Sequence, residues 1–158
     1  MGNGRANIGK KVYDFALKDQ DGKEVKLSDF AGKTVLISFH PLAWTEVCSK
    51  QMKALEENKE EFDSLNTVAV GVSVDPVPSK KAWAESLEIK STRLLSDFWP
   101  HGGIAELYDV FREDDGFSER ANVIVDQNKK VVYFKLYDID QLPDLDEIKE
   151  FLVELRKG

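Results

Sequence analysis

The order of hydrophobic and polar residues along the chain predicts strands that alternate with helices. Residues 34–39 form a nearly continuous β-branched and apolar run, which is typical of a central strand buried on both faces. Residues 46–65 carry apolar side chains at helical spacing among charged ones, and they predict a long, mostly solvated helix. A β-branched run over 67–74 and a helical segment over 79–87 then repeat this order. In that second helix we expect Ala82, Trp83 and Leu87 to face the core.

Shorter segments complete the prediction. Residues 12–17 and 24–27 flank the turn-rich tetrapeptide Asp19-Gln20-Asp21-Gly22 and indicate a β-hairpin. The other expected elements are a strand at 92–95, a helix at 103–108, paired strands at 121–125 and 131–137, and a final helix at 145–155. Together they predict an α/β fold with a mixed central β-sheet, helices on its faces and an N-terminal β-hairpin.

Length and charge narrow the class of protein. The chain has 158 residues, 42% of them hydrophobic, which suits a single domain over 1–158 with residues 1–10 as a flexible lead. A formal net charge of −7 disfavours binding to nucleic acid or to an anionic membrane. Because the sequence has neither a long apolar stretch nor a signal-peptide core, we expect a soluble protein that is not exported.

The small number of cysteines and histidines bounds the chemistry further. Cys48 is the only cysteine, so no disulfide can form within the sequence, and a reducing compartment such as the cytoplasm is expected. His40 and His101 with one cysteine are too few for a structural zinc site. We therefore expect no metal and no bound cofactor.

Cys48 follows the first central strand, near the start of the predicted long helix. Reactive groups gather beyond the carboxyl ends of strands in open α/β sheets, and a helix N-terminus favours a thiolate. A free cysteine with no further context is more often a small buried hydrophobe. The surrounding residues decide between these two interpretations.

The segment from Pro41 to Cys48 resembles the active-site loop of the peroxiredoxin family, of the AhpC/TSA type. That pattern is Pro, three residues, Thr or Ser, two residues and then the reactive Cys, which here are Pro41, Thr45 and Cys48. Further matches follow in the family's order; they are Ala82-Trp83, Leu94-Leu95-Ser96-Asp97, Pro100-His101-Gly102, Ser118-Glu119-Arg120-Ala121 and Val123-Ile124-Val125-Asp126. Nearly the whole chain is covered, and it is most similar to the one-cysteine enzymes of the alkyl hydroperoxide reductase E group. The resemblance implies a thioredoxin-like fold.

The resemblance also implies roles for four residues. Cys48 would attack the peroxide as a thiolate, and the Thr45 hydroxyl would bridge the sulfur and a peroxide oxygen. Arg120 would fold back beside the thiolate and favour it by its charge, while Pro41 would direct the loop and shield the sulfur. Without the resemblance, Thr45 would be a helix cap, Arg120 a solvated surface group and Pro41 a strand terminator.

Four neighbouring residues allow more than one interpretation. Trp44 and Trp83 could line the pocket or a dimer contact, although packing is the commoner role of such residues. His40 could hydrogen-bond near the site or be an ordinary structural histidine. Gln51 stands where many relatives carry a glutamate, which puts an acid-dependent hydrogen bond to the arginine in doubt, although an amide oxygen can also accept one.

A one-cysteine peroxidase needs help to complete its cycle. Oxidation by a hydroperoxide substrate produces a sulfenic acid, and Lys53, where some relatives carry a resolving cysteine, cannot reduce it. We therefore expect an external thiol, which could be a thioredoxin, a glutaredoxin-like protein or a low-molecular-weight thiol. By analogy with the family we also expect a homodimer or a higher homo-oligomer.

Other functions compete with the peroxidase. The same cysteine would serve a peroxide sensor that passes its oxidation to a partner. A dithiol oxidoreductase is disfavoured because the sequence lacks Cys-x-x-Cys. A purely structural interaction module would require that Cys48→Ser leave peroxide consumption unchanged.

Overall fold

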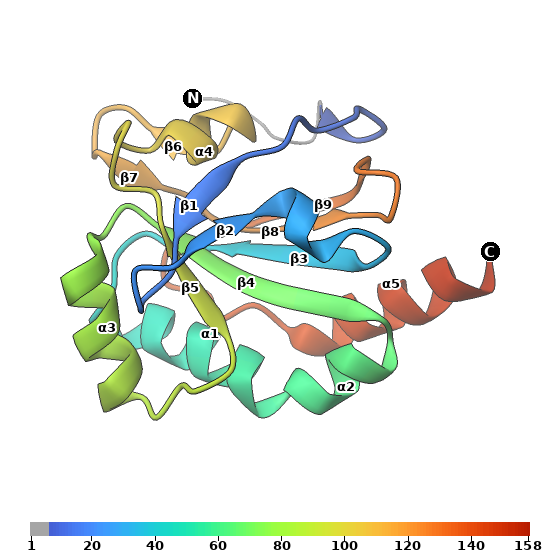
Figure 1. Cartoon of the computed structure of the whole chain (residues 1–158), viewed down its shortest axis with the longest axis horizontal. Coiled ribbons are helices and arrows are strands. Elements are labelled where there is room, and N and C mark those ends of the chain that lie inside the picture. The colour runs from blue at the N-terminus through green and yellow to red at the C-terminus, as the bar shows by residue number, and fades with distance from the viewer. Residues whose placement is uncertain (1–6) are drawn as a thin grey trace.

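A seven-stranded β-sheet forms the centre of the computed structural model, which describes residues 7–158 (Figure 1). The strands are β1 (Ala16–Lys18), β2 (Glu24–Lys26), β3 (Thr34–Phe39), β4 (Thr67–Ser73), β5 (Arg93–Ser96), β6 (Phe111–Arg112), β7 (Phe117–Ser118), β8 (Arg120–Val125) and β9 (Val131–Tyr137). The helices are the 3-10 helix η2 (Leu27–Phe30) and α1 (Glu46–Glu57), α2 (Lys59–Ser64), α3 (Val77–Ser86), α4 (Gly103–Leu107) and α5 (Leu145–Lys157).

The sheet is mixed, with the strand order β2-β1-β5-β4-β3-β8-β9. Strands β3, β4 and β5 are parallel, whereas β8 and β9 continue the sheet antiparallel beyond β3. The N-terminal hairpin of β1 and β2 joins the other edge, because β1 pairs antiparallel with β5. The predicted α/β fold, with its mixed sheet and N-terminal hairpin, is confirmed.

Each face of the sheet is covered by its own hydrophobic layer. Val35, Ile37 and Phe39 point toward the layer that contains residues of α4, while the alternating Leu36 points toward α1, α2, α3 and α5. Figure 1 shows these four helices below the sheet and α4 with the β6–β7 ribbon above it. None of the helices within the described residues has the length and apolar character that a membrane span requires.

The single helix expected over 46–65 is wrong, because Asn58 separates α1 from α2. Its side-chain amide donates to the carbonyl oxygen of Ala54 at 2.7 Å, and its oxygen accepts from Lys149 at 2.7 Å. An asparagine side chain that competes for backbone groups in this way interrupts a helix. The charged pattern of the segment concealed this break.

The N-terminal segment and the ribbon of β6 and β7 also differ from the expected elements. Residues 1–6 of the expected flexible lead lie outside the described residues, and Gly9 and Val12 donate backbone hydrogen bonds to the segment around β9. The regular hairpin begins only at Ala16, after Asp14 accepts hydrogen bonds from the backbone and hydroxyl of Ser28. The two-residue strands β6 and β7 were not predicted, since so short a ribbon has no detectable periodicity.

Helix α3 turns Trp83 and Leu87 toward the core as expected, but not Ala82. Ala82 is exposed, whereas Lys80, Trp83 and Ala84 are buried. The spacing of these three is that of one helix face, but a lysine is seldom fully buried and so was not assigned to the core. The expected orientation of Ala82 is therefore wrong, and a buried lysine replaces it.

Candidate active site

Cys48 lies in the first turn of α1, and its side chain is 0% exposed. The preceding loop is anchored to the end of β4, because the backbone N–H of Ala43 donates to Asp75 at 2.8 Å and Ser73 donates to the same carboxylate oxygen at 2.6 Å. This anchor places the sulfur beyond the carboxyl end of β3, near the positive end of the helix dipole.

Arg120 is the first residue of β8 and lies beside the sulfur. Its Nη1 donates to the Sγ of Cys48 at 3.3 Å, although the two residues are 72 positions apart in the chain. The other side of the guanidinium is held by the carbonyl oxygen of Ile139, which accepts from Nε at 2.9 Å and from Nη2 at 2.6 Å. These contacts leave the planar group little freedom to turn away from Cys48.

Gln51 connects Arg120 to the end of β3. Its side-chain oxygen accepts from Arg120 Nη1 at 2.6 Å, and its amide nitrogen donates to Ser38 Oγ at 2.7 Å and to the Phe39 carbonyl oxygen at 3.2 Å. The amide thus makes the hydrogen bond that a glutamate would otherwise make, without adding a negative charge.

Arg120 keeps its positive charge without a carboxylate partner. It is buried, and no Asp or Glu among residues 7–158 forms an ion pair with it. A buried cation is stabilised by an adjacent anion. The group positioned to supply that charge is the thiolate of Cys48.

Thr45 precedes α1 but does not cap it with its side chain. Its hydroxyl donates to the carbonyl oxygen of Leu42 at 2.8 Å, and no hydrogen bond from the helix reaches it. The oxygen therefore keeps its lone pairs on an exposed residue. Pro41 is buried at the start of the same loop, whose course requires a left-handed backbone at Trp44, with φ of 74°.

The two tryptophans occupy different environments. Trp44 is 54% exposed, with its indole N–H donating to Ser79 Oγ at 3.0 Å. Trp83 is packed in the core, and its indole donates to Ser49, the neighbour of Cys48, at 3.0 Å. Packing accounts for Trp83, whereas Trp44 forms part of the surface beside the loop.

His40 and Lys80 form a buried pair that the sequence did not reveal. Lys80 Nζ lies 3.4 Å from His40 Nε2, and both side chains are 0% exposed. Burial lowers the pKa of Lys80 to about 7. Electrostatic attraction to Asp75 and Cys48 acts in the opposite direction and raises this pKa, but it is the smaller effect. Burial and the adjacent Lys80 hold the pKa of His40 well below its ordinary value. The only signal in the sequence is the i, i+3, i+4 spacing of Lys80 with two core residues of α3.

The arrangement suits the reaction of a thiolate with a small electrophile. Cys48 supplies the sulfur, and the fixed Arg120 N–H groups face the position where its negative charge resides. These features come from α1, β8 and the loop between β3 and α1, so they assemble only in the folded chain.

Comparisons with known proteins agree with this arrangement. The sequence model of the AhpC/TSA family matches residues 8–134. The chain is 38% identical over 123 residues to alkyl hydroperoxide reductase E of Mycobacterium tuberculosis, covering 77% of this chain and 80% of that protein. It is 33% identical over 160 residues to peroxiredoxin-1 of Gekko japonicus, covering 93% of this chain and 78% of that protein.

Solved structures give the same relationship. The reduced 2-Cys peroxiredoxin of Plasmodium vivax superposes with a TM-score of 0.86 and 29% sequence identity, over 96% of this chain and 82% of that one. The family model covers well over half of the sequence, and alkyl hydroperoxide reductase E and peroxiredoxin-1 are each more than 30% identical to it over most of its length. The chain therefore belongs to the AhpC/TSA family and is a peroxiredoxin.

Proposed function

We propose that the chain reduces hydrogen peroxide and organic hydroperoxides through Cys48 and returns to the thiol state with the help of an external thiol. The observation that carries this proposal is the 3.3 Å contact between Arg120 Nη1 and Cys48 Sγ in a buried site. That contact favours the thiolate, which is the nucleophilic form of cysteine. Arg120, Thr45 and Pro41 are proposed as the supporting residues.

The reaction transfers one oxygen atom to sulfur. The Cys48 thiolate forms a bond to one peroxide oxygen as the O–O bond breaks, and the other oxygen leaves with the electron pair of that bond. The leaving oxygen takes up a proton and becomes water or an alcohol, while Cys48 becomes a sulfenic acid. Arg120 offers N–H groups to the charge that moves from sulfur to oxygen, and the Thr45 oxygen has free lone pairs for a peroxide O–H.

The sulfenic acid is then attacked by a thiol of another molecule. Cys48 is the only cysteine of the sequence, and the exposed Lys53 stands where a resolving cysteine is found in some relatives. A thioredoxin, a glutaredoxin-like protein or a low-molecular-weight thiol would form a mixed disulfide and release water. A reducing compartment such as the cytoplasm would supply these thiols.

Mass spectrometry of the intact protein tests this cycle. After one equivalent of hydrogen peroxide, we expect one added oxygen on Cys48, and after a candidate thiol we expect a mixed disulfide that returns to the free thiol. Cys48→Ser should show none of these adducts. Rapid oxidation of Cys48 that no thiol system can reverse would instead support the peroxide sensor.

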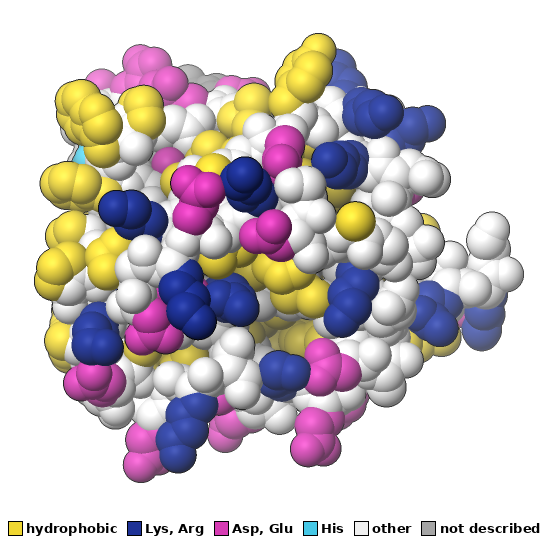
Figure 2. Space-filling model, in the orientation of Figure 1, with side chains coloured by type: hydrophobic (Ala, Val, Ile, Leu, Met, Phe, Trp, Pro, Cys, Tyr) yellow, Lys and Arg dark blue, Asp and Glu magenta, His cyan; other side chains and the backbone are white. Residues whose placement is uncertain are grey.

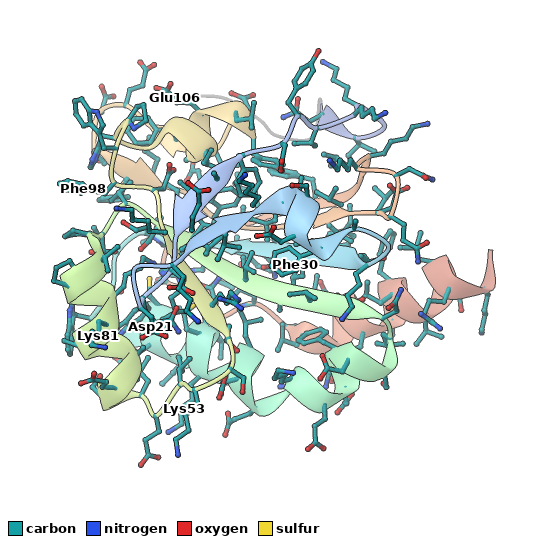
Figure 3. The ribbon with its side chains drawn as sticks, viewed as in Figure 1. Asp21, Phe30, Lys53, Lys81, Phe98 and Glu106 are labelled. Carbon is teal, nitrogen blue, oxygen red and sulfur yellow. The ribbon has the colours of Figure 1, made fainter. Side chains whose placement is uncertain are left out.

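We further propose that the protein forms a homodimer. Phe98 and Trp99 follow β5 and are 49% and 81% exposed, and Trp44 is exposed as well. Figure 2 shows hydrophobic side chains gathered along the left edge of the molecule, where Figure 3 labels Phe98. Large exposed aromatic groups are enriched in interfaces. Sedimentation should give a dimer at micromolar concentration, and a monomer alone would contradict this proposal.

A further inference from the structure

A buried chain of polar contacts runs from the active-site arginine to the lysine of α3. It passes from Arg120 to the Gln51 side-chain oxygen at 2.6 Å and from the Gln51 amide to Ser38 Oγ at 2.7 Å. The backbone oxygen of the same Ser38 lies 3.4 Å from His40 Nδ1, and His40 Nε2 lies 3.4 Å from Lys80 Nζ. The proposed reaction uses only the Arg120 end of this chain, so the Lys80 end needs its own explanation.

The contacts assign the proton positions on His40. A carbonyl oxygen can only accept, so Nδ1 carries the proton that is directed at Ser38, and Nε2 is left to accept from Lys80. The ring is therefore neutral, and any positive charge of the pair resides on Lys80. Gly71 on β4 leaves room for this ring, because a side chain there would collide with Met52 and press on the His40 imidazole.

Charged side chains on the elements around the Lys80–His40 pair both attract and repel a positive charge there. The charged or titratable groups that act on the pair are Asp75 after β4, Asp97 after β5, Cys48 on α1 and Arg120 on β8. Asp75 already accepts hydrogen bonds from Ala43 and Ser73, and Asp97 from the backbone of Ile104 and Ala105. Cys48 is therefore the group in this set whose charge changes during the proposed reaction.

We propose that Lys80, held by His40, is a positioning residue whose charge rises and falls with that of Cys48 and supports its thiolate. This inference deepens the proposed function, on which it rests. Trp83 strengthens the physical connection, because its ring lies 5.3 Å from that of His40 and its indole N–H donates to Ser49 beside Cys48. Lys80 and Cys48 thus belong to one buried unit of α1, α3 and the end of β3.

The proton balance of this coupling is simple. When the Cys48 thiol ionises, Lys80 changes from amine to ammonium, so the site gains a thiolate and a cation and its net charge stays the same. When the thiolate attacks peroxide, sulfur becomes a neutral sulfenic acid, and the leaving oxygen takes up one proton. Lys80 has then lost its anionic partner and releases one proton, which balances the proton taken up by the leaving oxygen. Overall, a thiol and a hydroperoxide give a sulfenic acid and water or an alcohol, with no net uptake or release of protons.

Removal of the Lys80 charge tests the coupling without any peroxide. The ultraviolet absorbance of the thiolate is measured against pH in the wild type, Lys80→Met and Lys80→Gln, each corrected for tyrosine absorbance with a matching Cys48→Ser protein. We expect roughly three- to tenfold less thiolate in both variants below about pH 7, since a nearby opposite charge favours ionisation by about that amount or more. Superimposable profiles of the folded variants and the wild type would overturn the inference.

Lys81→Met is the matched control. Lys81 is the next residue of α3, but it points to solvent and pairs with Asp21 at 3.6 Å and with Glu85 at 3.9 Å. Figure 3 labels Lys81 at α3 and Asp21 near it. The thiolate profile of Lys81→Met should match that of the wild type; a shift as large as that of Lys80→Met would also contradict a specific coupling.

A second measurement keeps the test decisive if the Lys80 variants do not fold. Lysine side chains are labelled with carbon-13, and the lysine that titrates near neutral pH is followed by nuclear magnetic resonance in the wild type and in Cys48→Ser. Coupling is reciprocal, so Lys80 should lose its proton at lower pH in Cys48→Ser, which has no thiolate. An unchanged titration would overturn the inference.

These measurements separate the inference from the proposed function. A shifted thiolate profile in a protein that fails to reduce peroxide would refute the peroxidase proposal and leave the coupling intact. Normal peroxide reduction with an unshifted profile would refute the coupling alone.

Discussion

The Nη1 of Arg120 lies 3.3 Å from the Sγ of Cys48, and the same nitrogen lies 2.6 Å from the side-chain oxygen of Gln51. One N–H-bearing atom thus contacts both the Cys48 sulfur and a neutral amide. A neutral amide orients the guanidinium without cancelling its charge, so the thiolate proposed at Cys48 would keep the full electrostatic support of a buried cation. The consequences of this relationship can be measured.

Removal of the Arg120 charge should slow the reaction with peroxide. Arg120→Met keeps much of the side-chain length but removes the N–H groups that face the sulfur and the leaving oxygen. We expect oxidation of Cys48 to slow roughly a hundredfold, in line with the loss of a single well-placed donor. Stopped-flow mixing with hydrogen peroxide measures the rate. Arg93→Met, which removes a partly exposed arginine paired with Asp19 at 2.7 Å, should leave it unchanged.

A carboxylate at position 51 should weaken the thiolate. Gln51→Glu would place a negative charge against Arg120 and close to Cys48, so the pH midpoint of thiolate absorbance should rise and less thiolate should be present at neutral pH. Gln127→Glu adds the same charge in an exposed loop beyond the far end of β8 and serves as the control. Equal midpoints in Gln51→Glu and the control would contradict the role assigned to the neutral amide.

The hydroxyl of Thr45 should matter for peroxide more than for the fold. Thr45→Val keeps the shape of the side chain but loses the hydrogen bond to Leu42 and the lone pairs that face outward. We expect a roughly tenfold or greater loss in the rate of Cys48 oxidation, comparable to the loss of a hydrogen bond to a charged group. Thr45→Ser keeps the hydroxyl and should restore most of the rate. Equal rates for the valine and serine variants would assign Thr45 to the backbone turn alone.

Burial of Lys80 should make the free energy of unfolding depend on pH. The pKa of Lys80 is lowered to about 7 in the folded chain, compared with 10.5 as its ordinary value. Between these two values the unfolded chain binds more protons, so the contribution of Lys80 to stability improves as pH rises from about 7 to about 10.5. Below about pH 7 its full destabilising effect is present.

Urea denaturation of the wild type and Lys80→Met at several pH values tests this dependence. The free energy of unfolding of the wild type, relative to that of the variant, should rise as pH increases from about 7 to about 10.5. The same comparison with Lys81→Met should stay flat, because Lys81 is exposed. If the difference in the free energy of unfolding between the wild type and Lys80→Met did not change with pH, the lowered pKa of a buried Lys80 would be contradicted.

Local patterns in the sequence predicted most of the fold. The run at 34–39 coincides with β3, and the strands at β4, β8 and β9 begin within one residue of their expected starts. Such runs are reliable because a strand buried on both faces must be apolar along its whole length. The helix of 46–65 was misjudged at Asn58, because a single side chain that hydrogen-bonds to its own backbone leaves the wider periodicity unchanged.

The sequence by itself identified the candidate nucleophile and its loop, because Pro41, Thr45 and Cys48 lie within one short segment whose spacing carries the resemblance. The resemblance predicted Arg120 beside the sulfur, whereas only the tertiary structure decided how Arg120 is held there and that Lys80 is buried nearby. Arg120 reaches Cys48 because β8 pairs with β3, and Lys80 reaches His40 because α3 packs against β5 in the same hydrophobic layer as Leu36 of β3. Periodicity alone predicts neither contact, and Arg120 was expected there only from the resemblance, since a single charged side chain is buried or exposed according to partners that folding brings together.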